Sequence, residues 1–438
     1  DMPKSNNDLL AILGGTPAAD KPFEFNNSIS DEEKTAVLRV IENGELSGFI
    51  ASPGEPFWGG QEVRGLQEEF QTRFSIKHAI AFNSATSALH AAVAATGIGP
   101  GDEVITSPYT MSATATAILM TGAVPIFADI EDTTFGIDPA SVEACLSGNT
   151  KGILAVNIFG HAAQLDRLRE VAANNDLFLL EDNAQAPGAL FKGESTGTIG
   201  DAGIFSFNRH KVMQCGEGGV LVTDDDKIAQ KAALVRNHGE SVVAAMEIDD
   251  IVNTVGLNYR MTEMEAAVAR EQFRKMDGLN KQRIALANRL TAGLSNIDGL
   301  TPPLVNAEST HVYYMYAIRY NEDEIRLPRN LFAQAIEAEG FFLRPGYVKP
   351  LYLEPLYQRK ICFGPNGFPF IANDRNAEIS YSEGICPTCE RLQNNELMIT
   401  PMAQPPQTAQ DMDLFVQACK KVIRNKDDLL AGASNLAL

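Results

Sequence analysis

The strongest constraint on the fold is an alternation of short apolar runs with amphipathic stretches between about residues 62 and 236. Helical patterns such as Ser84–Gly97 and Ser112–Thr121 separate apolar runs of strand length. This order predicts an α/β domain with a mostly parallel sheet of the seven-stranded type, flanked by helices. Such sheets bind ligands at the carboxyl ends of their strands, so candidate site residues should follow the strands. The predicted strands are Ala79–Phe82, Glu103–Thr106, Val124–Phe127, Gly152–Val156, Leu177–Glu181, Ile204–Phe207 and Val220–Thr223.

The pattern changes beyond about residue 280. We predict a large α/β domain over residues 61–280 and a smaller C-terminal α+β domain over residues 281–438. Residues 1–60 are rich in Gly and Pro, and we expect them to form an arm with a helix that crosses the surface and helps to line the site. The elements expected in the smaller domain are helices at Lys281–Leu294, Arg329–Glu339 and Ala409–Arg424 and a tyrosine-rich strand at Val312–Tyr320.

The charge balance excludes two classes of partner. Lys and Arg number 36 while Asp and Glu number 56, which gives a formal charge of −20. Such a surface repels nucleic-acid phosphates and anionic lipid. No apolar run reaches the length of a membrane span. We therefore expect neither nucleic acid nor a membrane as a partner.

The cysteines and the first residues indicate the cellular compartment. The segment from Asp1 to Asn7 is polar and lacks the layout of a signal peptide. Six cysteines in 438 residues do not make a disulfide framework. We expect the reducing cytoplasm. Cys386 and Cys389 form a lone CxxC without a second pair or a nearby His, and we interpret them as incidental thiols rather than a zinc or redox site.

Two acidic residues end one predicted strand. The apolar run that starts at Leu177 finishes in Glu181 and Asp182, with Gln185 three positions further on. A carboxylate at a strand end can be buried against a cation, and the protonated ring nitrogen of pyridoxal 5′-phosphate needs such a partner. The alternative is an Asp that only caps the following turn.

A lysine lies in the loop between two later strands. Lys211 follows the predicted strand Ile204–Phe207 and precedes Gly216-Glu-Gly218-Gly219. A partly shielded lysine at a strand end can lose its charge and attack a carbonyl. Ser206 could bind phosphate, and the glycines let backbone amides approach a ligand. The alternative is an ordinary surface lysine in a loop.

Two further segments could reach a ligand. Asn83-Ser84-Ala85-Thr86-Ser87 places small hydroxyl residues where a helix begins, and a helix N-terminus attracts phosphate. A simple N-cap explains the same residues. Gly256–Thr262 is a short polar insert before a helix, and its Asn258 and Arg260 could contact a ligand. Composition alone would make it only a helix start.

Taken together, these segments resemble the DegT/StrS-type sugar aminotransferases, a branch of fold type I of the pyridoxal-phosphate enzymes. The resemblance runs from about Leu10 to Val422. The motifs that carry it, in chain order, are NSATSALH, GIGPGDEVITSPYT, EDNAQAPGA, GDAGIFSFNRHK, GEGG and GLNYRMTE. Several separated motifs in the right order are far more specific than any one of them.

The resemblance implies a cofactor, pyridoxal 5′-phosphate, with pyridoxamine 5′-phosphate as the intermediate form. It implies that Lys211 forms the internal aldimine and moves the proton, and that Asp182 pairs with the ring nitrogen. It also implies a homodimer with shared active sites, because Asn258 matches a phosphate ligand from the neighbouring subunit. The remaining matches are Gln185 at the ring hydroxyl, Ser206 at the phosphate, and Ala85, Thr86 and Ser87 in the phosphate-binding turn.

Three departures from the family pattern fall on the substrate side. Met111 occupies the position that usually stacks an aromatic ring on the cofactor, with Tyr109 as the substitute if the register differs. The usual Pro-Leu-His reads Pro350-Leu351-Tyr352. The stretch between Tyr357 and Glu383 is longer than usual.

The expected function is transfer of an amino group from glutamate or glutamine to a keto sugar, nucleotide-linked, or to a related cyclic ketone. One alternative is a sugar dehydratase of the same family, in which His replaces the lysine; here His210 directly precedes Lys211. Another is an aminotransferase, or a related dehydratase or cyclase, acting on a cyclitol or an amino-shikimate-type ring. A catalytically idle relative is disfavoured because Lys211, Asp182, Gln185 and Ser206 are all retained.

Overall fold

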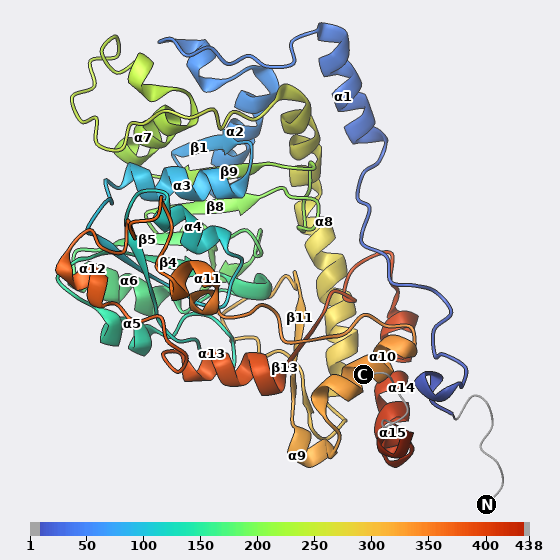
Figure 1. The fold of residues 1–438 in the computed structure, drawn as a ribbon. Helices are drawn as coiled ribbons and strands as arrows, with labels where there is room; N and C mark the ends of the chain where they lie inside the picture. Colours follow the sequence, from blue (N-terminus) through green and yellow to red (C-terminus); the bar gives the residue numbers. More distant parts are fainter. Residues whose placement is uncertain (1–8, 433–438) are drawn as a thin grey trace, which may run out of the picture.

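The computed structural model describes residues 9–432 (Figure 1). Seven strands form the central sheet of the part drawn uppermost in Figure 1, which we call the upper lobe. The sheet order is β1-β9-β8-β5-β4-β2-β3, and only β9 runs antiparallel to its two neighbours. This confirms the predicted α/β class and the mostly parallel sheet. The polar segment Asp1 to Asn7, whose sequence lacks the layout of a signal peptide, lies outside the described residues. The strands are β1 (His78–Phe82), β2 (Glu103–Thr106), β3 (Val124–Phe127), β4 (Thr150–Val156), β5 (Phe178–Asp182), β8 (Ala202–Ser206) and β9 (Gly219–Thr223).

Helices cover both faces of this sheet because successive side chains of a strand point to opposite faces. In β1, Ile80 and Phe82 pack in the same cluster as residues of α3 and α7, whereas Ala79 and Ala81 pack in the cluster that holds residues of α2 and α8. Phe70 of α2 stacks on Phe273 of α8 with ring centroids 4.1 Å apart. The helices around the sheet are α2 (Gln61–Phe74), α3 (Ala85–Ala95), α4 (Ala113–Leu119), α5 (Pro139–Cys145), α6 (Leu165–Asn174), α7 (Asp226–Arg236) and the first part of α8 (Glu263–Leu294), while β6 (Leu190–Phe191) and β7 (Glu194–Ser195) form a separate hairpin.

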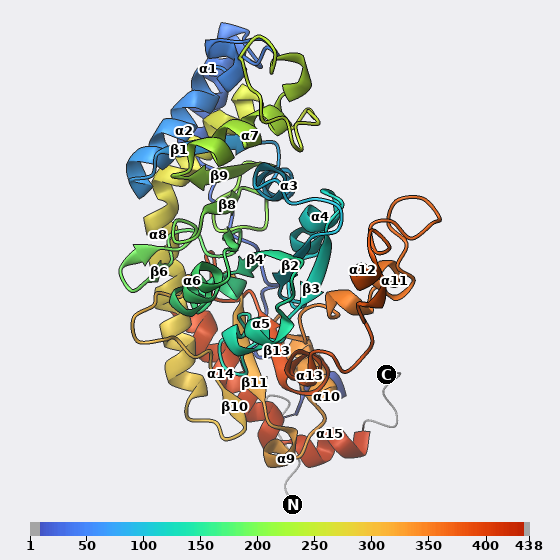
Figure 2. The same cartoon turned by 90° about the vertical axis from the view of Figure 1, so that its left-hand side faces the viewer.

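The lower lobe is built on a second, antiparallel sheet of order β10-β11-β13-β12. The long helix α8 runs from the upper lobe into the lower one, as both Figure 1 and Figure 2 show. Residue 280, where we expect the large domain to end, lies inside this helix, so the division stays a prediction. The elements are β10 (Leu300–Thr301), β11 (Tyr316–Tyr320), β12 (Arg344–Pro345), β13 (Leu397–Thr400), α9 (Glu322–Ile325), α10 (Arg329–Ala338), α14 (Ala409–Arg424) and α15 (Lys426–Gly432).

The N-terminal arm runs along the molecule from the lower lobe to α1 (Asp31–Asn43) at the top (Figure 1). Its lower end is held by Glu339, whose carboxylate accepts hydrogen bonds from the backbone N–H groups of Ala11 and Ala18 at 2.9 and 3.0 Å. Its upper end is held by Glu33 of α1, which is 1% exposed and lies 2.7 Å from Lys275 Nζ of α8. The arm is therefore tied to both lobes by buried carboxylates.

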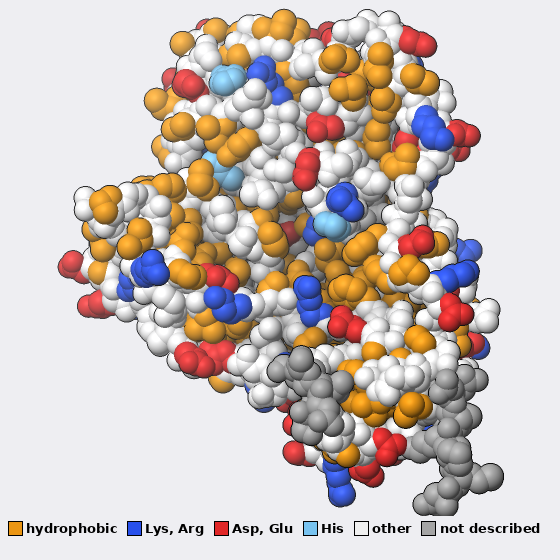
Figure 3. Space-filling model, turned by 45° about the vertical axis from the view of Figure 1, so that its right-hand side comes forward, with side chains coloured by type: hydrophobic (Ala, Val, Ile, Leu, Met, Phe, Trp, Pro, Cys, Tyr) orange, Lys and Arg blue, Asp and Glu red, His pale blue; other side chains and the backbone are white. Residues whose placement is uncertain are grey.

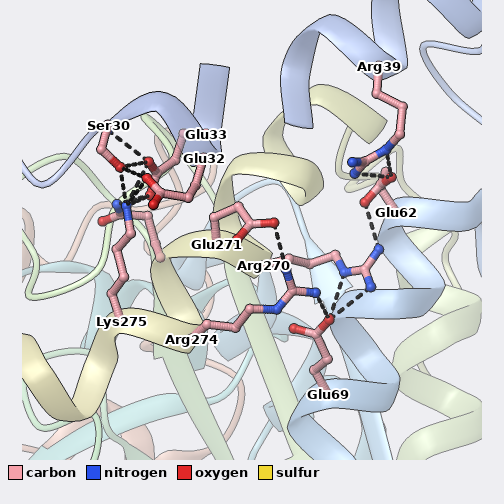
Figure 4. Close-up of polar contacts among 11 residues, drawn as sticks. Ser30, Glu32, Glu33, Arg39, Glu62, Glu69, Arg270, Glu271, Arg274 and Lys275 are labelled. Carbon is pink, nitrogen blue, oxygen red and sulfur yellow. Dashed lines mark hydrogen bonds and ion pairs between the residues drawn. The ribbon is translucent and has the colours of Figure 1, made fainter. Parts of the chain in front are cut away.

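A chain of ion pairs joins α1, α2 and α8 (Figure 4). Glu62 of α2 accepts from Arg39 of α1 at 2.9 Å and from Arg270 of α8 at 2.7 Å. Glu69, further along α2, pairs with Arg270 and Arg274 at 2.8 and 2.5 Å. Each carboxylate contacts two guanidinium groups, so the three helices are fixed to one another around a shared network.

Residues 351–391 leave the lower lobe and pack against the edge strand β3 (Figure 2). Tyr381 donates its hydroxyl hydrogen to the backbone oxygen of Pro125 at 2.8 Å, and Arg375 pairs with Glu103 at 3.2 Å. The stretch between Tyr357 and Glu383, which we expect to be longer than usual, therefore covers a sheet edge. Tyr352 is fully buried and donates a hydrogen bond to Glu390. The helices of residues 351–391 are α11 (Pro355–Gln358), α12 (Asp374–Glu378) and α13 (Pro387–Arg391).

Cys386 and Cys389 are buried at the start of α13. The Cys386 thiol faces the backbone oxygen of Phe127 at 3.7 Å. Burial raises the pKa of both thiols, which keeps them protonated. Within residues 9–432 no group of three or more His, Cys, Asp or Glu side chains could hold a metal ion, and no helix there is long and apolar enough to cross a membrane.

Candidate active site

A cavity of about 350 Å³ lies at the carboxyl ends of β4, β5 and β8, where Val156, Asp182 and Ser206 contribute to its wall. Parallel strands end at the same edge of a sheet, so residues far apart in sequence meet here. Figure 3 shows hydrophobic side chains gathered at mid-height on one face of the molecule, with basic side chains and a histidine close by. Seven of the nine predicted site residues line the cavity: Ala85, Thr86, Met111, Asp182, Gln185, Ser206 and Lys211.

The N-terminus of α3 forms one wall of the cavity. Ser84 is its N-cap and accepts a hydrogen bond from the backbone N–H of Ser87 at 3.0 Å. Ala85 and Thr86 line the cavity, whereas the Ser87 hydroxyl turns to Asn83 Oδ1 at 2.7 Å and does not. The free N–H groups and the positive end of the helix dipole suit an anionic group such as phosphate.

Asp182 lies at the end of β5 and is buried. Its Oδ2 accepts a hydrogen bond from the Thr114 hydroxyl at 2.8 Å, and its Oδ1 accepts one from the backbone N–H of Ala184 at 3.2 Å. Burial raises the pKa of Asp182, while these two hydrogen bonds and the charge of Lys211 act in the opposite direction. A buried carboxylate of this kind gains from a cationic partner, so the site fits a protonated pyridine nitrogen.

The neighbouring Glu181 has a different role although it is also buried. Its carboxylate accepts hydrogen bonds from the backbone N–H groups of Gly197, Ile199 and Gly200 at 2.7, 2.7 and 2.8 Å. It points to the other face of β5 and is no part of the cavity wall. Glu181 thus holds a loop, and only Asp182 of the acidic pair faces the cavity.

Lys211 reaches the cavity from the loop after β8. Its backbone N–H donates to the backbone oxygen of Asn208 at 2.8 Å, and the N–H of Arg209 donates to Gly216 at 3.0 Å. The Lys211 Nζ lies 4.5 Å from the ring centroid of Tyr314. His210 also lines the cavity, but its ring is exposed and packs on Phe25 with centroids 5.6 Å apart.

Gln185 is held between the two lobes. Its Oε1 accepts from the backbone N–H of Phe159 at 2.7 Å, and its Nε2 donates to the Tyr347 hydroxyl at 3.0 Å. Tyr109 supports this arrangement from behind, because its buried hydroxyl accepts from the Tyr347 backbone N–H at 3.1 Å. Tyr109 does not line the cavity, whereas Met111 does and is 58% exposed.

Asn258 lies outside the cavity on the surface of the upper lobe. Its Oδ1 accepts from Arg260 Nε at 2.9 Å. The next residue, Tyr259, ties the loop to the base of α3: its hydroxyl lies 3.0 Å from His90 Nδ1, and its backbone oxygen accepts from Asn83 at 2.9 Å. In this single chain the structure therefore does not bring Asn258 and Lys211 together.

Several residues of the cavity wall were not singled out from the sequence. Tyr314 and Tyr347 come from beyond residue 280, and only a tyrosine-rich pattern marked the first of them. Asn208 and Glu217 lie inside the lysine motif, and Asn208 Nδ2 donates to Glu217 Oε1 at 3.0 Å. Thr114, which donates to Asp182, sits in the predicted helix Ser112–Thr121 without any signal of its role.

Two sequence expectations differ from the structure around this site. Residues 9–60 of the arm cross the surface as expected, but none of them lines the cavity; Phe25 reaches only His210. The predicted strand Val312–Tyr320 was wrong in its first part, because only Tyr316–Tyr320 is strand. Tyr313 has a left-handed φ of +52° and breaks the extended backbone before it.

Comparison with known proteins identifies relatives over most of the chain. The model of the DegT/DnrJ/EryC1/StrS aminotransferase family matches residues 50–379. The spore coat polysaccharide biosynthesis protein SpsC of Bacillus subtilis is 36% identical over 71% of this chain and 79% of its own length. A putative L-glutamine:3-amino-2,3-dideoxy-scyllo-inosose aminotransferase of Streptoalloteichus tenebrarius is 32% identical over 96% of this chain and 99% of its own length. GDP-perosamine synthase of Caulobacter vibrioides is 34% identical over 72% of this chain and 85% of its own length.

Solved structures have the same fold. An aminotransferase from Psychrobacter cryohalolentis superimposes with a TM-score of 0.78 at 29% identity, covering 92% of this chain and 99% of that one. DesV of S. venezuelae, solved with a ketimine intermediate, superimposes with a TM-score of 0.73 at 29% identity, covering 89% of this chain and 95% of that one.

Proposed function

The chain belongs to the DegT/DnrJ/EryC1/StrS aminotransferase family, and on that premise we propose that it moves an amino group from glutamate or glutamine to a keto sugar, nucleotide-linked, or to a related cyclic ketone. It is an aminotransferase and, like the other members of this family, it depends on pyridoxal 5′-phosphate. One observation carries the proposal: an amine (Lys211), a buried carboxylate (Asp182) and a helix N-terminus (Ala85) share one cavity.

The residues around the cavity fit this cofactor. Asp182 would hold the ring nitrogen, and Met111 would pack on the ring. The bound cofactor supplies an electron sink that lets an amino group be carried between two substrates. The phosphate would be held at the N-terminus of α3 by Ala85 and Thr86 and by the Ser206 hydroxyl at the end of β8.

The chain's own groups would then have distinct tasks. Lys211 would hold the cofactor covalently through Nζ and, once released, take up and return the proton during the transfer. Asp182 would keep the ring nitrogen protonated through its carboxylate. Gln185, fixed by Phe159 and Tyr347, would present its amide to the ring hydroxyl.

We include a homodimer with shared sites in the proposal. Asn258 would act on the partner's site, which agrees with its exposed position outside its own cavity. Large apolar side chains on the same lobe are more than half exposed, among them Leu38, Ile41, Ile50 and Val255. The upper part of Figure 3 shows many such side chains. Exposed apolar surface of this kind is typical of a protein interface.

We also propose a cytoplasmic location. All six cysteines of the chain are free thiols, three of them buried. Free thiols persist in a reducing compartment, whereas secreted proteins pair theirs.

A cyclitol ketone is the second candidate acceptor. The observation that favours it is the extent of the alignments. The alignment with the putative scyllo-inosose aminotransferase covers 96% of this chain and 99% of that protein. The alignment with GDP-perosamine synthase covers 72% of this chain and 85% of that protein. The two candidates differ in charge, because a nucleotide-linked sugar carries a diphosphate and a cyclitol ketone carries none.

The test is a pair of half-reactions with the full chain and added cofactor. Glutamate and glutamine should each be tried as donors while absorbance reports conversion to the pyridoxamine form. The converted protein is then offered keto sugars with and without a nucleotide, and scyllo-inosose. We expect conversion by one donor and reversal by one ketone class. Inertness toward every amino donor would instead favour the dehydratase alternative or a catalytically idle relative.

A further inference from the structure

We propose that Tyr314 is a positioning residue for Lys211: the face of its ring holds the lysine amine in place whenever the amine is not bonded to the cofactor. The inference rests on the proposed function, since it assigns Tyr314 a task through Lys211. Tyr314 would act without bonding to the cofactor or the substrate itself.

The contact between the two residues is direct. The Lys211 Nζ lies 4.5 Å from the Tyr314 ring centroid, within the range of a cation–π interaction, and both residues line the cavity. Among residues 9–432, Lys211 Nζ has no hydrogen bond and no ion-pair partner within 4.0 Å. The ring face is therefore in direct contact with the amine, while the charge of Asp182 attracts it from further away.

The hydroxyl of Tyr314 has no comparable role. It makes no hydrogen bond with any residue of the described chain, in contrast to Tyr347, whose hydroxyl accepts from Gln185 at 3.0 Å. The two tyrosines of the cavity wall thus use different parts of the side chain. Tyr347 uses its hydroxyl and Tyr314 uses its ring face.

The backbone before Tyr314 is held in an unusual conformation. Tyr313 has a φ of +52°, and its ring stacks on that of His311 with centroids 3.9 Å apart and planes 4° from parallel. Its N–H donates to His311 Nδ1 at 3.0 Å, and its oxygen accepts from the buried Arg283 of α8 at 3.1 Å. A strained conformation persists only where surrounding contacts enforce it, and here they aim the next side chain at Lys211.

The upper lobe clamps the same turn from the other side. Gly160 has a φ of +104°, and a β-carbon there would come within 2.8 Å of the Tyr313 nitrogen and 3.0 Å of the Tyr314 nitrogen. Its oxygen accepts from the Val312 N–H at 2.9 Å. The turn that carries Tyr314 is therefore fixed to the loop that also carries Phe159, the backbone partner of Gln185.

The chemistry explains why a ring suits this place better than a carboxylate. A buried carboxylate beside Lys211 would form an ion pair whose partner is costly to release. An aromatic face attracts the ammonium more weakly and accepts no proton. Lys211 can then be held in position and still give up its proton during the transfer.

The test measures how exposed the Lys211 amine is, without measuring turnover. The full chain is loaded with pyridoxamine 5′-phosphate, so that the amine is free, and is pulsed with acetic anhydride at one pH. Mass spectrometry then compares acetylation of Lys211 with that of the exposed Lys151 as internal reference. The variants are Tyr314→Phe, which keeps the ring, and Tyr314→Leu, with Tyr314→Met as a second ringless variant should the first fail to fold.

We expect Tyr314→Leu or Tyr314→Met to raise the relative acetylation of Lys211 about three- to tenfold, because the amine is no longer held against a ring. Tyr314→Phe should match the unchanged protein. Unchanged acetylation in a folded ringless variant, or an equal rise in Tyr314→Phe, would overturn the proposal. Borohydride trapping of pyridoxal phosphate on Lys211 tests the proposed function separately, so the two failures are distinguishable.

Discussion

Gly219, the first residue of β9, lies so close to the start of α3 that a β-carbon there would come within 2.5 Å of the Ala85 backbone nitrogen. Glycine at this position lets the strand support the helix end that faces the cavity. An alanine would push Ala85 and Thr86 out of place, since backbone atoms cannot yield as a flexible side chain does.

We therefore expect Gly219→Ala to weaken cofactor binding about tenfold or more, a loss of about 1.4 kcal/mol. Equilibrium titration with pyridoxal phosphate, followed by absorbance, measures it. Gly148→Ala is the matched control, because Gly148 is exposed and a β-carbon added there would have no neighbouring atom within 4 Å. Equal affinity in both variants would argue against a phosphate site at α3.

Asp182→Asn should leave the lysine bond to the cofactor intact and slow the transfer of the amino group. The neutral amide cannot form a charge pair with a protonated ring nitrogen, so it no longer keeps that nitrogen protonated. A hydrogen-bonded charged partner contributes about 1.5–3 kcal/mol, so we expect a rate about 10- to 100-fold lower. Single-turnover conversion with glutamate measures the rate, and Asp166→Asn, on the surface, is the control. A full rate in Asp182→Asn would remove this residue from the chemistry.

The attachment of α1 should depend on pH through Glu33. Burial alone would raise the pKa of Glu33, but hydrogen bonds from Lys275, Gln272 and Ser30 outweigh it and lower the pKa from 4.5 to about 2. A lowered pKa means that the stabilisation is complete above pH 4.5 and is lost as the pH falls toward 2.

Urea unfolding between pH 7 and pH 2 checks this dependence. The free energy of unfolding should fall over the acid part of the range, and the share that Glu33 contributes, up to about 3 kcal/mol, should be missing in Glu33→Gln. Glu32→Gln is the matched control, since Glu32 is exposed and also contacts Lys275. An identical acid slope in the unchanged protein and in Glu33→Gln would contradict the assignment.

Mixed dimers test the placement of Asn258. If Asn258 serves the partner's site, a dimer of one Lys211→Ala chain and one Asn258→Ala chain contains one native site, and mixing two inactive proteins restores activity. Mixing Lys211→Ala with Asp182→Asn gives no native site, because both residues line the same cavity of one chain. Recovery in neither mixture would argue against a contact of Asn258 with the partner's site.

Much of the large sheet was predictable because its strands are buried on both faces and read as apolar runs. The predicted ranges Glu103–Thr106 and Val124–Phe127 coincide with β2 and β3. The grouping of Asp182, Ser206 and Lys211 followed from the same logic, since strand ends meet at one edge.

Other parts of the site depend on contacts between segments distant in sequence. The strand prediction failed at Val312 because packing of Tyr313 on His311, rather than local propensity, determines the backbone there. Tyr347 enters the cavity wall through bonds to Tyr109 and Gln185, which lie more than 150 residues away. The sequence signals the residues of single motifs but not partners that only the packed lobes bring together.

The central claim is that Lys211 bonds to pyridoxal phosphate. Borohydride reduction of the cofactor-loaded protein, followed by peptide mass spectrometry, should find the reduced adduct on Lys211. Lys211→Ala should lack the adduct and the reducible absorbance band, while a variant of the adjacent residue, His210→Ala, should keep both. A Lys211→Ala protein that retains the reducible band, or an adduct on another lysine, would contradict the account.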